Sequence, residues 1–302
     1  MADFLMDYFG FDPDFIPEVS PTFSLQGYVT KAAAVASGLP AGIPVAYRAG
    51  DQPNNALSLN VLNPGEIAAT GGTSGVVYGV LDRPAYDPQS RVNGFAHVNH
   101  HKAQPRIGIL LCINGSGILY AWVRQNLAEK GVSYNDMERL AAAIPIGSDG
   151  LRILPFGNGA ERMLGNRNPG AQVNNLHFNR HGQAHVYRAA LEGIAFSFVH
   201  GVQILKDMGL DVSVMRVGND NLFQSTVFAH TVATLLGCSI EVVETTGAVG
   251  AAKASGVATG IYPSLHDAMK GAKALTTYMP QGDREAYQAA YAAWGGDLGR
   301  LV

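Results

Sequence analysis

Short β-rich runs alternate with helical patterns in the second half of the chain, and few folds accommodate this order. A long helix is expected over His185–Met208. It is followed by strand Val214–Val217, helix Leu222–Leu236, strand Ser239–Val243 and helix Ala248–Gly260. A helix between consecutive strands returns the chain to the same sheet edge. The second half therefore predicts an α/β sheet with crossover helices.

The part before residue 150 is expected to begin with short strands and to continue with helices. Turn residues separate its first apolar runs, which is typical of a β-meander. The predicted strands are Ile43–Ala49, Leu57–Leu62, Glu66–Ala69, Val76–Leu81 and His97–His101. The remaining predicted elements are helices Gly117–Lys130 and Ser133–Ala143, strand Leu151–Pro155 and helix Arg284–Leu301. Ser133 is the expected N-cap of its helix, because Asp136 follows three residues later.

Composition and charge exclude several classes of function. The 302 residues are 47% hydrophobic, and 21 basic against 24 acidic residues give a net charge of −3. No run of Lys or Arg stands out, so we expect no nucleic-acid partner and no membrane partner. The longest apolar run, Ile107–Ile113, is too short to span a bilayer, and the acidic N-terminus is unlike a secretory signal. A cytoplasmic location is therefore expected, with Cys112 and Cys238 as buried free thiols and a disulfide as the weaker alternative.

Residues 1–24 differ in pattern from the rest of the chain. Apolar residues recur at helical spacing up to Phe9, after which Pro13, Pro17 and Pro21 prevent a regular element. We therefore expect a helix tail and a linker over residues 1–24, left from a missing first domain. Residues 25–302 are expected to form one domain.

A candidate acid–base residue follows the predicted strand Ile43–Ala49. In Gly50-Asp51-Gln52, the carboxylate of Asp51 is expected to project from the strand end, where it could accept a proton from a substrate hydroxyl. The alternative is an ordinary turn, since Gly and Asp both favour turns. On these three residues alone the turn is the better interpretation.

A glycine-rich segment between two predicted strands is a candidate phosphate site. Thr70-Gly71-Gly72-Thr73-Ser74-Gly75 lets the backbone approach a phosphate closely, and its hydroxyls add donors. The alternative is a glycine-rich hairpin turn. Both interpretations stay open.

Two further segments have weaker signals. Val217-Gly218-Asn219-Asp220-Asn221 joins a strand to a helix, so Gly218 could admit a flat ring or a phosphate, and Asp220 or Asn221 could simply cap the helix. Glu161 and Arg162 could pair to fix their loop, or Arg162 could face a phosphate. The structural interpretation is favoured for both segments.

Other patterns are expected to carry no chemistry. His97, His100 and His101 lack accompanying ligands at metal-site spacing and are expected to be surface residues, so no metal site is predicted. Gly115-Ser116-Gly117 lacks the remaining residues of a dinucleotide fingerprint, and the sequence contains no P-loop.

The candidate segments, taken in order, resemble a known family. Gly50-Asp51-Gln52, Asn63-Pro64-Gly65-Glu66 and Thr70–Gly75 resemble the second domain of the FGGY carbohydrate kinases, and the xylulokinase branch most of all. Gly159–Arg162 and Arg188–Phe196 resemble later segments of the family. The resemblance runs from about residue 10 to the end of the chain. The family's Asp-x-Gly-Thr phosphate loop, which belongs to the first domain, has no match.

The resemblance implies a fold, a reaction and a set of roles. The fold would be an actin-like, ribonuclease H-like ATPase domain with a mixed sheet flanked by helices. The reaction would be transfer of the ATP γ-phosphoryl group to a sugar hydroxyl with Mg²⁺. Asp51 would be the catalytic base and Gln52 would lie beside the substrate. The β- and γ-phosphates would bind at Gly71, Gly72, Thr73 and Ser74, and adenosine at Gly218 and Asn219, where the family usually has a second glycine.

Several alternatives stay open. The partners implied are ATP, a small sugar and the missing N-terminal kinase domain. The sugar could be xylulose, or ribulose, glycerol or gluconate as in other branches of the family. The chain could instead be a stand-alone nucleotide-binding module without transferase activity, or a domain that binds nothing. An apolar surface left by a missing domain can also drive self-association, for example into a homodimer.

Overall fold

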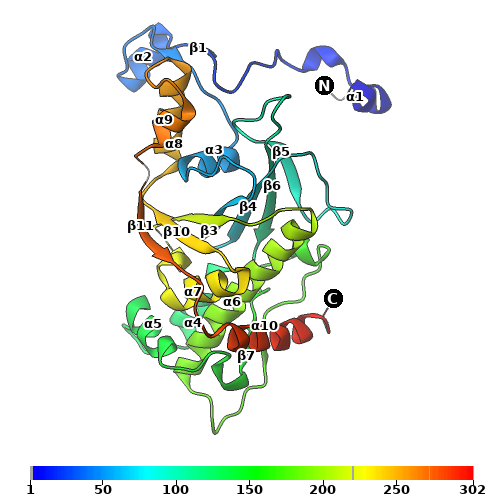
Figure 1. Ribbon diagram of the computed structural model, residues 1–302, viewed down its shortest axis with the longest axis vertical. Helices are drawn as coiled ribbons and strands as arrows, with labels where there is room; N and C mark the ends of the chain where they lie inside the picture. Colours follow the sequence, from blue (N-terminus) through cyan, green and yellow to red (C-terminus); the bar gives the residue numbers. More distant parts are fainter. Residues whose placement is uncertain (1–2, 220, 272, 302) are drawn as a thin grey trace. The chain divides into compact units, whose positions relative to one another are not determined.

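The computed structural model describes residues 3–219, 221–271 and 273–301 (Figure 1). The chain forms two compact units. Unit 1 contains residues 3–49 and Ala252–Ala268, and unit 2 contains Gly50–Ala251 and residues 269–301. Unit 2 holds the large sheet and every segment that the sequence singled out for chemistry.

The largest sheet within the described residues has seven strands in the order β11-β10-β9-β3-β4-β6-β5 (Figure 1). Its strands are β3 (Glu66–Gly71), β4 (Gly75–Leu81), β5 (Asn93–Ala96), β6 (Ile107–Ile113), β9 (Val214–Gly218), β10 (Ser239–Val243) and β11 (Ala274–Tyr278). β9 pairs in parallel with both β3 and β10, whereas the other pairs are antiparallel. The sheet is therefore mixed. Because β3 and β9 are parallel, their carboxyl ends lie at the same edge.

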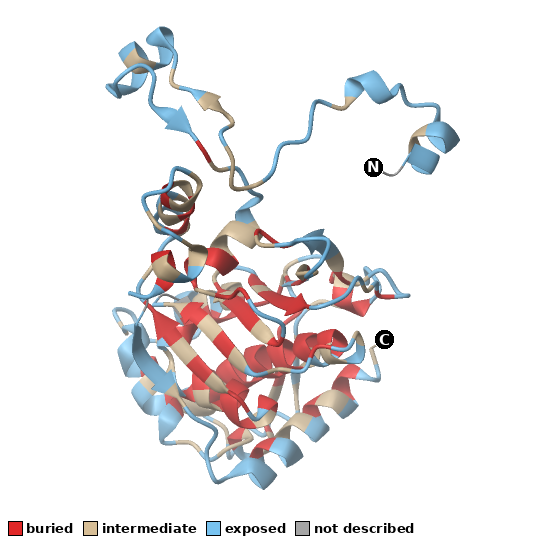
Figure 2. Ribbon diagram, turned by 45° about the horizontal axis from the view of Figure 1, so that its top comes forward, coloured by how far each residue is buried: buried red, intermediate tan, exposed pale blue. Residues whose placement is uncertain are grey.

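Helices of unit 2 cover both faces of this sheet. They are α3 (Asp51–Ser58), α4 (Gly117–Asn126), α5 (Tyr134–Ala142), α6 (Gln183–Asp207), α7 (Thr226–Leu236) and α10 (Arg284–Leu298). Alternate residues of a strand point to opposite faces. On one face, Ile67 and Leu111 join a core with Phe198 of α6 and Phe228 of α7. Buried residues concentrate in the strands and in the helices packed on them (Figure 2).

The opposite face of the sheet carries helix α3. Ala56 of this helix and Leu59 just after it pack with Tyr78, Val80 and Leu110 in a smaller, separate apolar cluster. The described part of unit 2 also contains short elements: η2 (Ser148–Gly150), β7 (Arg152–Leu154), η3 (Arg162–Leu164), β8 (Gln172–Asn174) and η4 (Asn221–Gln224). β7 and β8 pair as a separate antiparallel hairpin.

Unit 1 is built from short elements. They are α1 (Asp3–Phe9), η1 (Pro13–Phe15), β1 (Gly27–Tyr28), α2 (Lys31–Ser37) and β2 (Pro44–Val45). β1 and β2 pair antiparallel, and the rings of Phe23 and Tyr47 lie 5.4 Å apart. Two helices cross the boundary between the units in sequence: α8 (Gly247–Ala258) and α9 (Leu265–Met269). No helix in the described ranges is long and apolar enough to cross a membrane.

The predicted alternation of strands and helices in the second half is confirmed, from α6 through β9, α7 and β10 to α8. The helix predicted from Leu222 begins instead with η4, and α7 starts at Thr226 with Ser225 as its N-cap. The predicted cap of α5 is also confirmed, because Ser133 and Asp136 form a reciprocal capping box. Asn221, one of the two residues predicted to cap this helix, is instead the first residue of η4, and the other, Asp220, lies outside the described residues.

Three of the predicted strands are wrong. Ile43–Ala49 contains only the two-residue β2, and Leu57–Leu62 is the end of α3 and the turn after it. A helix forms there because Pro53 is tolerated in the first helical turn and Ala56 and Leu57 are buried. His97–His101 is a turn following β5, closed by a bridge between His101 and Gln104.

Candidate functional site

A hollow of about 490 Å³ lies in unit 2 beside the edge where β3 and β9 end. Segments far apart in the sequence line it: the glycine-rich turn, the starts of α4 and α5, and the segment after β9. The described lining residues are Gly71, Gly72, Thr73, Gly117, Ile118, Tyr120, Ala121, Tyr134, Asn135, Glu138, Leu222, Gln224 and Ser225. The hollow is within the size range of small-molecule sites, roughly 300–1,000 Å³.

The glycine-rich turn between β3 and β4 is fastened to the start of α4. The carbonyl oxygens of Gly72 and Thr73 accept hydrogen bonds from the N–H groups of Gly117 (3.0 Å) and Ile118 (3.1 Å). A side chain on Gly117 would put its Cβ 2.3 Å from the Gly72 oxygen, so this contact requires glycine at 117. The hydroxyls of Thr73 and Ser74 remain exposed.

Gly71 and Gly75 pair with each other where β3 ends and β4 begins, on either side of the turn. Glycine is present at both positions because a side chain would not fit. A Cβ on Gly71 would lie 3.0 Å from Cβ of Leu222, and one on Gly75 would lie 2.5 Å from the Phe198 ring. Neither glycine has a left-handed φ. Close packing, and not a special backbone conformation, therefore explains these two glycines.

The segment after β9 lies next to this turn. Gly218 ends β9 and Asn219 is exposed, with its carbonyl oxygen accepting a hydrogen bond from Gln224 Nε2 (3.3 Å). Leu222, Gln224 and Ser225 line the hollow, while Gly218, Asn219 and Ser74 are not among its described lining residues. The structure thus brings the two predicted loops together, although the residues after Gly218 make the contact.

Two tyrosines form an aromatic wall of the hollow, which sequence reasoning missed. The rings of Tyr120 on α4 and Tyr134 on α5 are stacked, with centroids 5.6 Å apart and planes 25° apart. The Arg124 guanidinium lies 4.7 Å from the Tyr134 ring centroid. Burial, as the largest cause, raises the pKa of the Tyr120 hydroxyl. Aromatic residues in two predicted helices were visible in the sequence, but nothing local indicated that they meet.

Glu138 joins α5 to the start of α7. Its carboxylate accepts hydrogen bonds from the hydroxyls of Ser225 (2.6 Å) and Thr226 (2.7 Å) and from the N–H of Val227 (2.9 Å). A carboxylate at a helix N-terminus satisfies free N–H groups and complements the helix dipole. The segment between β9 and α7 is therefore held against α5. This role of Glu138 was also not predicted.

Asp51 and Gln52 are the first two residues of α3, and not the end of a strand as predicted. Asp51 is exposed, and its Oδ1 accepts a hydrogen bond from the Gln52 N–H (2.8 Å). Neither residue is among the described residues that line the hollow. The structure therefore leaves Asp51 accessible at a helix start.

The far end of α3 is anchored by buried polar groups. His97 Nε2 bonds with the carbonyl oxygen of Val61 (3.0 Å), and Arg216 donates to the carbonyl oxygen of Asn60 (2.8 Å). Arg216 also pairs with Glu66 (3.0 Å) and Glu241 (2.7 Å). Hydrogen bonds and charge from Arg216 and from nearby N–H groups outweigh burial and lower the pKa of Glu66. These contacts fix the turn that follows α3.

His97 is buried, with 2% of its surface exposed, so its prediction as a surface residue is wrong. Its Nδ1 lies 2.9 Å from the Tyr78 hydroxyl. His100 and His101 are exposed as predicted. Within the described residues no group of three or more His, Cys, Asp or Glu could hold a metal ion. Both cysteines are free, and Cys238 is buried as predicted. Cys112 on β6 is exposed, so its prediction as a buried residue is wrong.

Glu161 and Arg162 each bond to other parts of unit 2. The Glu161 carboxylate accepts hydrogen bonds from the N–H groups of Asn114 (3.0 Å) and Gly115 (2.7 Å), and its burial raises its pKa. Arg162 donates to the Ser90 carbonyl oxygen (2.6 Å) and to Asn93 Oδ1. Both side chains thus hold loops in place, but each does so through partners of its own, and not through the predicted pairing of Glu161 with Arg162.

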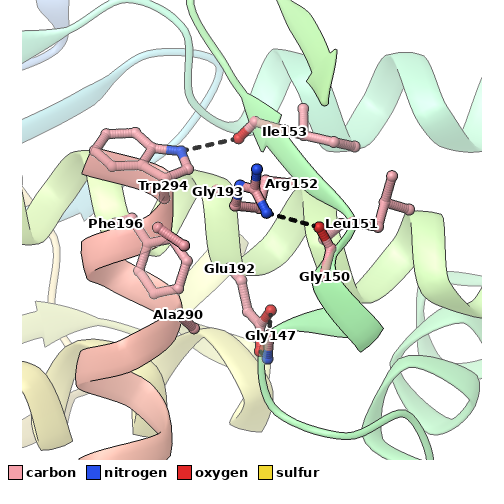
Figure 3. A pocket seen from close by; sticks show the side chains of 12 residues that line it. Gly147, Gly150, Leu151, Arg152, Ile153, Glu192, Gly193, Phe196, Ala290 and Trp294 are labelled. Carbon is pink, nitrogen blue, oxygen red and sulfur yellow. Dashed lines mark hydrogen bonds between the residues drawn. The ribbon is translucent and has the colours of Figure 1, made fainter. Parts of the chain in front are cut away.

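A second hollow, of about 70 Å³, lies between β7, α6 and α10 (Figure 3). Trp294 donates its indole N–H to the carbonyl oxygen of Ile153 (3.0 Å), and Arg152 donates to that of Gly150 (2.9 Å) (Figure 3). A water molecule occupies about 30 Å³ in the liquid, so this hollow is far too small for a nucleotide.

The chain is similar to several known carbohydrate kinases. A model of the FGGY family of carbohydrate kinases, C-terminal domain, matches residues 67–259. Gluconokinase of Bacillus subtilis is 27% identical over 197 residues, which cover 62% of this chain and 37% of that protein. Autoinducer-2 kinase of Yersinia enterocolitica is 28% identical over 309 residues, covering 96% and 56%.

Solved structures agree in fold. Xylulose kinase of Rhodospirillum rubrum has a TM-score of 0.86 at 26% identity, covering 100% of this chain and 60% of that one. Plasmodium falciparum glycerol kinase with ADP has a TM-score of 0.84 at 19% identity, covering 99% and 59%. The mixed sheet with flanking helices is thus the expected actin-like ATPase fold.

The chain spans 37% of the gluconokinase and between 56% and 60% of the autoinducer-2, xylulose and glycerol kinases. The family model covers residues 67–259, which is more than half of the 302 residues. This chain therefore belongs to the FGGY family of carbohydrate kinases and represents the C-terminal domain of that family.

Proposed function

We propose that this chain is the nucleotide-binding C-terminal half of an ATP-dependent kinase that phosphorylates a sugar hydroxyl, residues 1–24 being the end of a first domain and its linker. The hollow beside the carboxyl ends of β3 and β9 supports the proposal most strongly. It combines a turn with close backbone approach, the exposed Thr73 and an aromatic wall in a volume suited to a nucleotide. Ligands of open α/β sheets commonly bind at the carboxyl ends of strands.

We assign the phosphates of ATP to the turn formed by Gly71, Gly72, Thr73 and Ser74. The exposed hydroxyls of Thr73 and Ser74 can donate to phosphate oxygens. Adenosine is assigned to the side of the hollow formed by the segment that begins with Gly218 and Asn219. We include Asn219 although it is not itself among the described residues that line the hollow. Its carbonyl oxygen accepts a hydrogen bond from Gln224, which does line the hollow.

We assign the role of catalytic base to Asp51, with Gln52 beside the substrate. The sugar oxygen forms a bond to the γ-phosphorus while the bond from that phosphorus to the leaving oxygen of ADP breaks. The hydroxyl proton moves to a carboxylate oxygen of Asp51. Asp51 is exposed at the start of α3, so a substrate can reach it. Because little covalent chemistry is required, positioning of the two substrates provides most of the catalysis.

The described residues that line the hollow do not form a site for Mg²⁺. Mg²⁺ prefers carboxylate and phosphate oxygens. Glu138, the carboxylate among the described lining residues, uses both oxygens at the start of α7. Any Mg²⁺ is therefore expected to come with the phosphates of ATP, and no step is assigned to it.

The sugar is proposed from similarity alone. Xylulose is the first candidate, because xylulose kinase of Rhodospirillum rubrum is similar over the whole chain. Gluconate, glycerol and ribulose are the alternatives. The cytoplasmic location and the homodimer also stay predictions.

The proposal is tested by Asp51→Asn in a kinase that contains the family's first domain as well as this chain. We expect kcat to fall at least about 100-fold, because general-base catalysis commonly contributes 10²–10⁴-fold. The affinity for ATP should stay within a factor of about two, since Asp51 does not line the hollow. Sugar-dependent ADP release and calorimetric titration with ATP measure these quantities.

The matched control is Asp82→Asn, which removes another exposed carboxylate outside the hollow. It should leave turnover unchanged. An Asp51→Asn enzyme that keeps most of its turnover would remove Asp51 from the role of base. Failure of the unaltered chain to bind ATP or ADP would overturn the nucleotide site itself.

A further inference from the structure

Two chemically different groups line the hollow, and they bear on the choice of nucleotide. One is the glycine-rich turn, with its backbone N–H groups and the Thr73 side chain. The other is the pair Tyr134 and Glu138, which lie four residues apart on α5 and so on one side of that helix. The inference below rests on the proposed nucleotide site.

Tyr134 is built as a stacking surface. Tyr120 and Arg124 lie four residues apart on α4 and therefore on one side of that helix. Tyr120 stacks on the Tyr134 ring, and the Arg124 guanidinium lies 4.7 Å from its centroid. Both groups thus contact the ring from α4, while 44% of Tyr134 stays exposed. An aromatic ring held in this way can stack on a flat base whatever pattern of hydrogen-bond donors and acceptors the base carries on its edges.

The charge of Glu138 orients a nucleotide in the hollow. Glu138 is a lining residue one helical turn from Tyr134, and its carboxylate would repel phosphate oxygens there. Phosphates are therefore favoured at the glycine-rich turn, and the base is favoured beside Tyr134. Neither the repulsion by Glu138 nor stacking on Tyr134 depends on which base is present.

The polar side chains among the described lining residues do not specify one purine. Reading the N1–H and amino group of guanine takes an acceptor, and a carboxylate serves best. Both oxygens of Glu138 already accept hydrogen bonds from Ser225, Thr226 and Val227. The described lining side chains also include the amides of Asn135 and Gln224, each of which presents a donor and an acceptor and can match adenine or guanine.

We propose that Tyr134 is the base-stacking residue of this site and that the site accepts adenine and guanine nucleotides alike. The affinities for ADP and GDP should then agree within about tenfold. CDP should bind more weakly than either, because its single ring covers less of Tyr134. The chain would thus bind either an adenine or a guanine nucleotide as the phosphoryl donor.

The test is calorimetric titration of the 302-residue chain with ADP, GDP and CDP, and with inorganic pyrophosphate as a probe without a base. Tyr134→Ala should weaken ADP and GDP by a similar factor, about 5- to 150-fold for a stacking contribution of 1–3 kcal/mol. It should leave pyrophosphate binding unchanged. Tyr134→Phe, which keeps the ring, should behave as the unaltered chain.

Tyr86→Ala is the matched control, because Tyr86 is 82% exposed and lies outside the described lining. It should change none of these affinities. ADP binding that Tyr134→Ala leaves intact would overturn the stacking role while the proposed function stands. A preference of more than 100-fold for ADP over GDP in the unaltered chain would overturn the permissive choice of base, and this measurement needs no variant. Absence of ADP binding by the unaltered chain would instead overturn the proposed function.

Discussion

At the scale of single residues, His97 occupies the least expected environment. The Val61 carbonyl can only accept a hydrogen bond, so His97 donates to it from Nε2. Nδ1 is then the acceptor for the Tyr78 hydroxyl. Burial, the largest cause, lowers the pKa of His97 to about 4. The neutral ring is therefore part of the folded state.

We expect His97 to make unit 2 sensitive to acid. Its pKa in the folded state lies below the value of about 6.5 in an unfolded chain, so the folded state disfavours the bound proton. The stability that the neutral ring contributes is complete above pH 6.5 and is lost as the pH falls from 6.5 to about 4. The loss approaches about 3 kcal/mol, at 1.36 kcal/mol for each pH unit between the two values.

Urea unfolding at several pH values measures this effect. Both tryptophans of the chain, Trp122 and Trp294, belong to unit 2, so their fluorescence reports its unfolding. His97→Asn should flatten the pH dependence between pH 6.5 and 4, whereas His100→Asn, at an exposed position, should not. Equal slopes for His97→Asn and the unaltered chain would contradict the prediction.

The burial of His97 could not be predicted from its neighbours in sequence. Gly108 lies on another strand, and a Cβ there would be 1.7 Å from the Tyr78 hydroxyl. Only this glycine leaves room for Tyr78 to reach His97. By contrast, Ser133 and Asp136 were predicted as a cap because they are three residues apart on one helix. Local spacing reveals local contacts, and the His97 environment depends on distant strands.

At the scale of elements, periodicity predicted the strands and helices whose own sequence alternates or repeats clearly. α6, β9, α7 and β10 are of this kind. α3 was missed because Leu57 was interpreted as the start of a strand, and the packing of Ala56 and Leu59 against β3 and β4 joins residues that are distant in sequence. The turn from Gly71 to Gly75 was predicted, but its attachment to α4 was not, since that contact joins residues over 40 positions apart.

We expect Gly117→Ala to disrupt the contact between the glycine-rich turn and α4. The new Cβ would lie 2.3 Å from the Gly72 oxygen, so the two segments must separate. Strain of this kind costs typically about 1–3 kcal/mol. Gly296→Ala is the control, because its Cβ meets no atom within 4 Å on α10 and alanine favours helices.

Urea unfolding followed by circular dichroism gives the free energies, and titration with ADP gives the affinities. Gly117→Ala should lower both stability and ADP affinity. Gly296→Ala should lower neither. A Gly117→Ala chain as stable as the unaltered one would show that the turn can move away from α4 without cost.

At the scale of the whole molecule, the order of the motifs along the sequence identified the family. The make-up of unit 1, however, could not be predicted from the sequence. Unit 1 joins residues 3–49 with Ala252–Ala268, which are about 200 positions apart. No local pattern predicts that these segments form one compact unit. The ordered motifs succeeded because each belongs to a single turn or helix.

We expect the chain alone to bind ATP weakly and to phosphorylate no sugar. It spans 60% of the Rhodospirillum rubrum kinase, and we expect the proposed sugar site to need groups from the family's first domain. A coupled assay for ADP release, with xylulose, ribulose, gluconate and glycerol in turn, measures activity. Calorimetry with ATP measures binding. Sugar-dependent ADP release by the chain alone at the rate of a complete kinase would contradict the prediction.

The attachment of the glycine-rich turn to α4 has an entropic consequence. Ordering one residue of flexible backbone costs about 1–2 kcal/mol. Because the carbonyl groups of Gly72 and Thr73 are already held by Gly117 and Ile118, the turn is ordered before any ligand arrives. An anion bound at this edge would therefore lose little affinity to loop ordering, and its position would be set by the rigidity of α4.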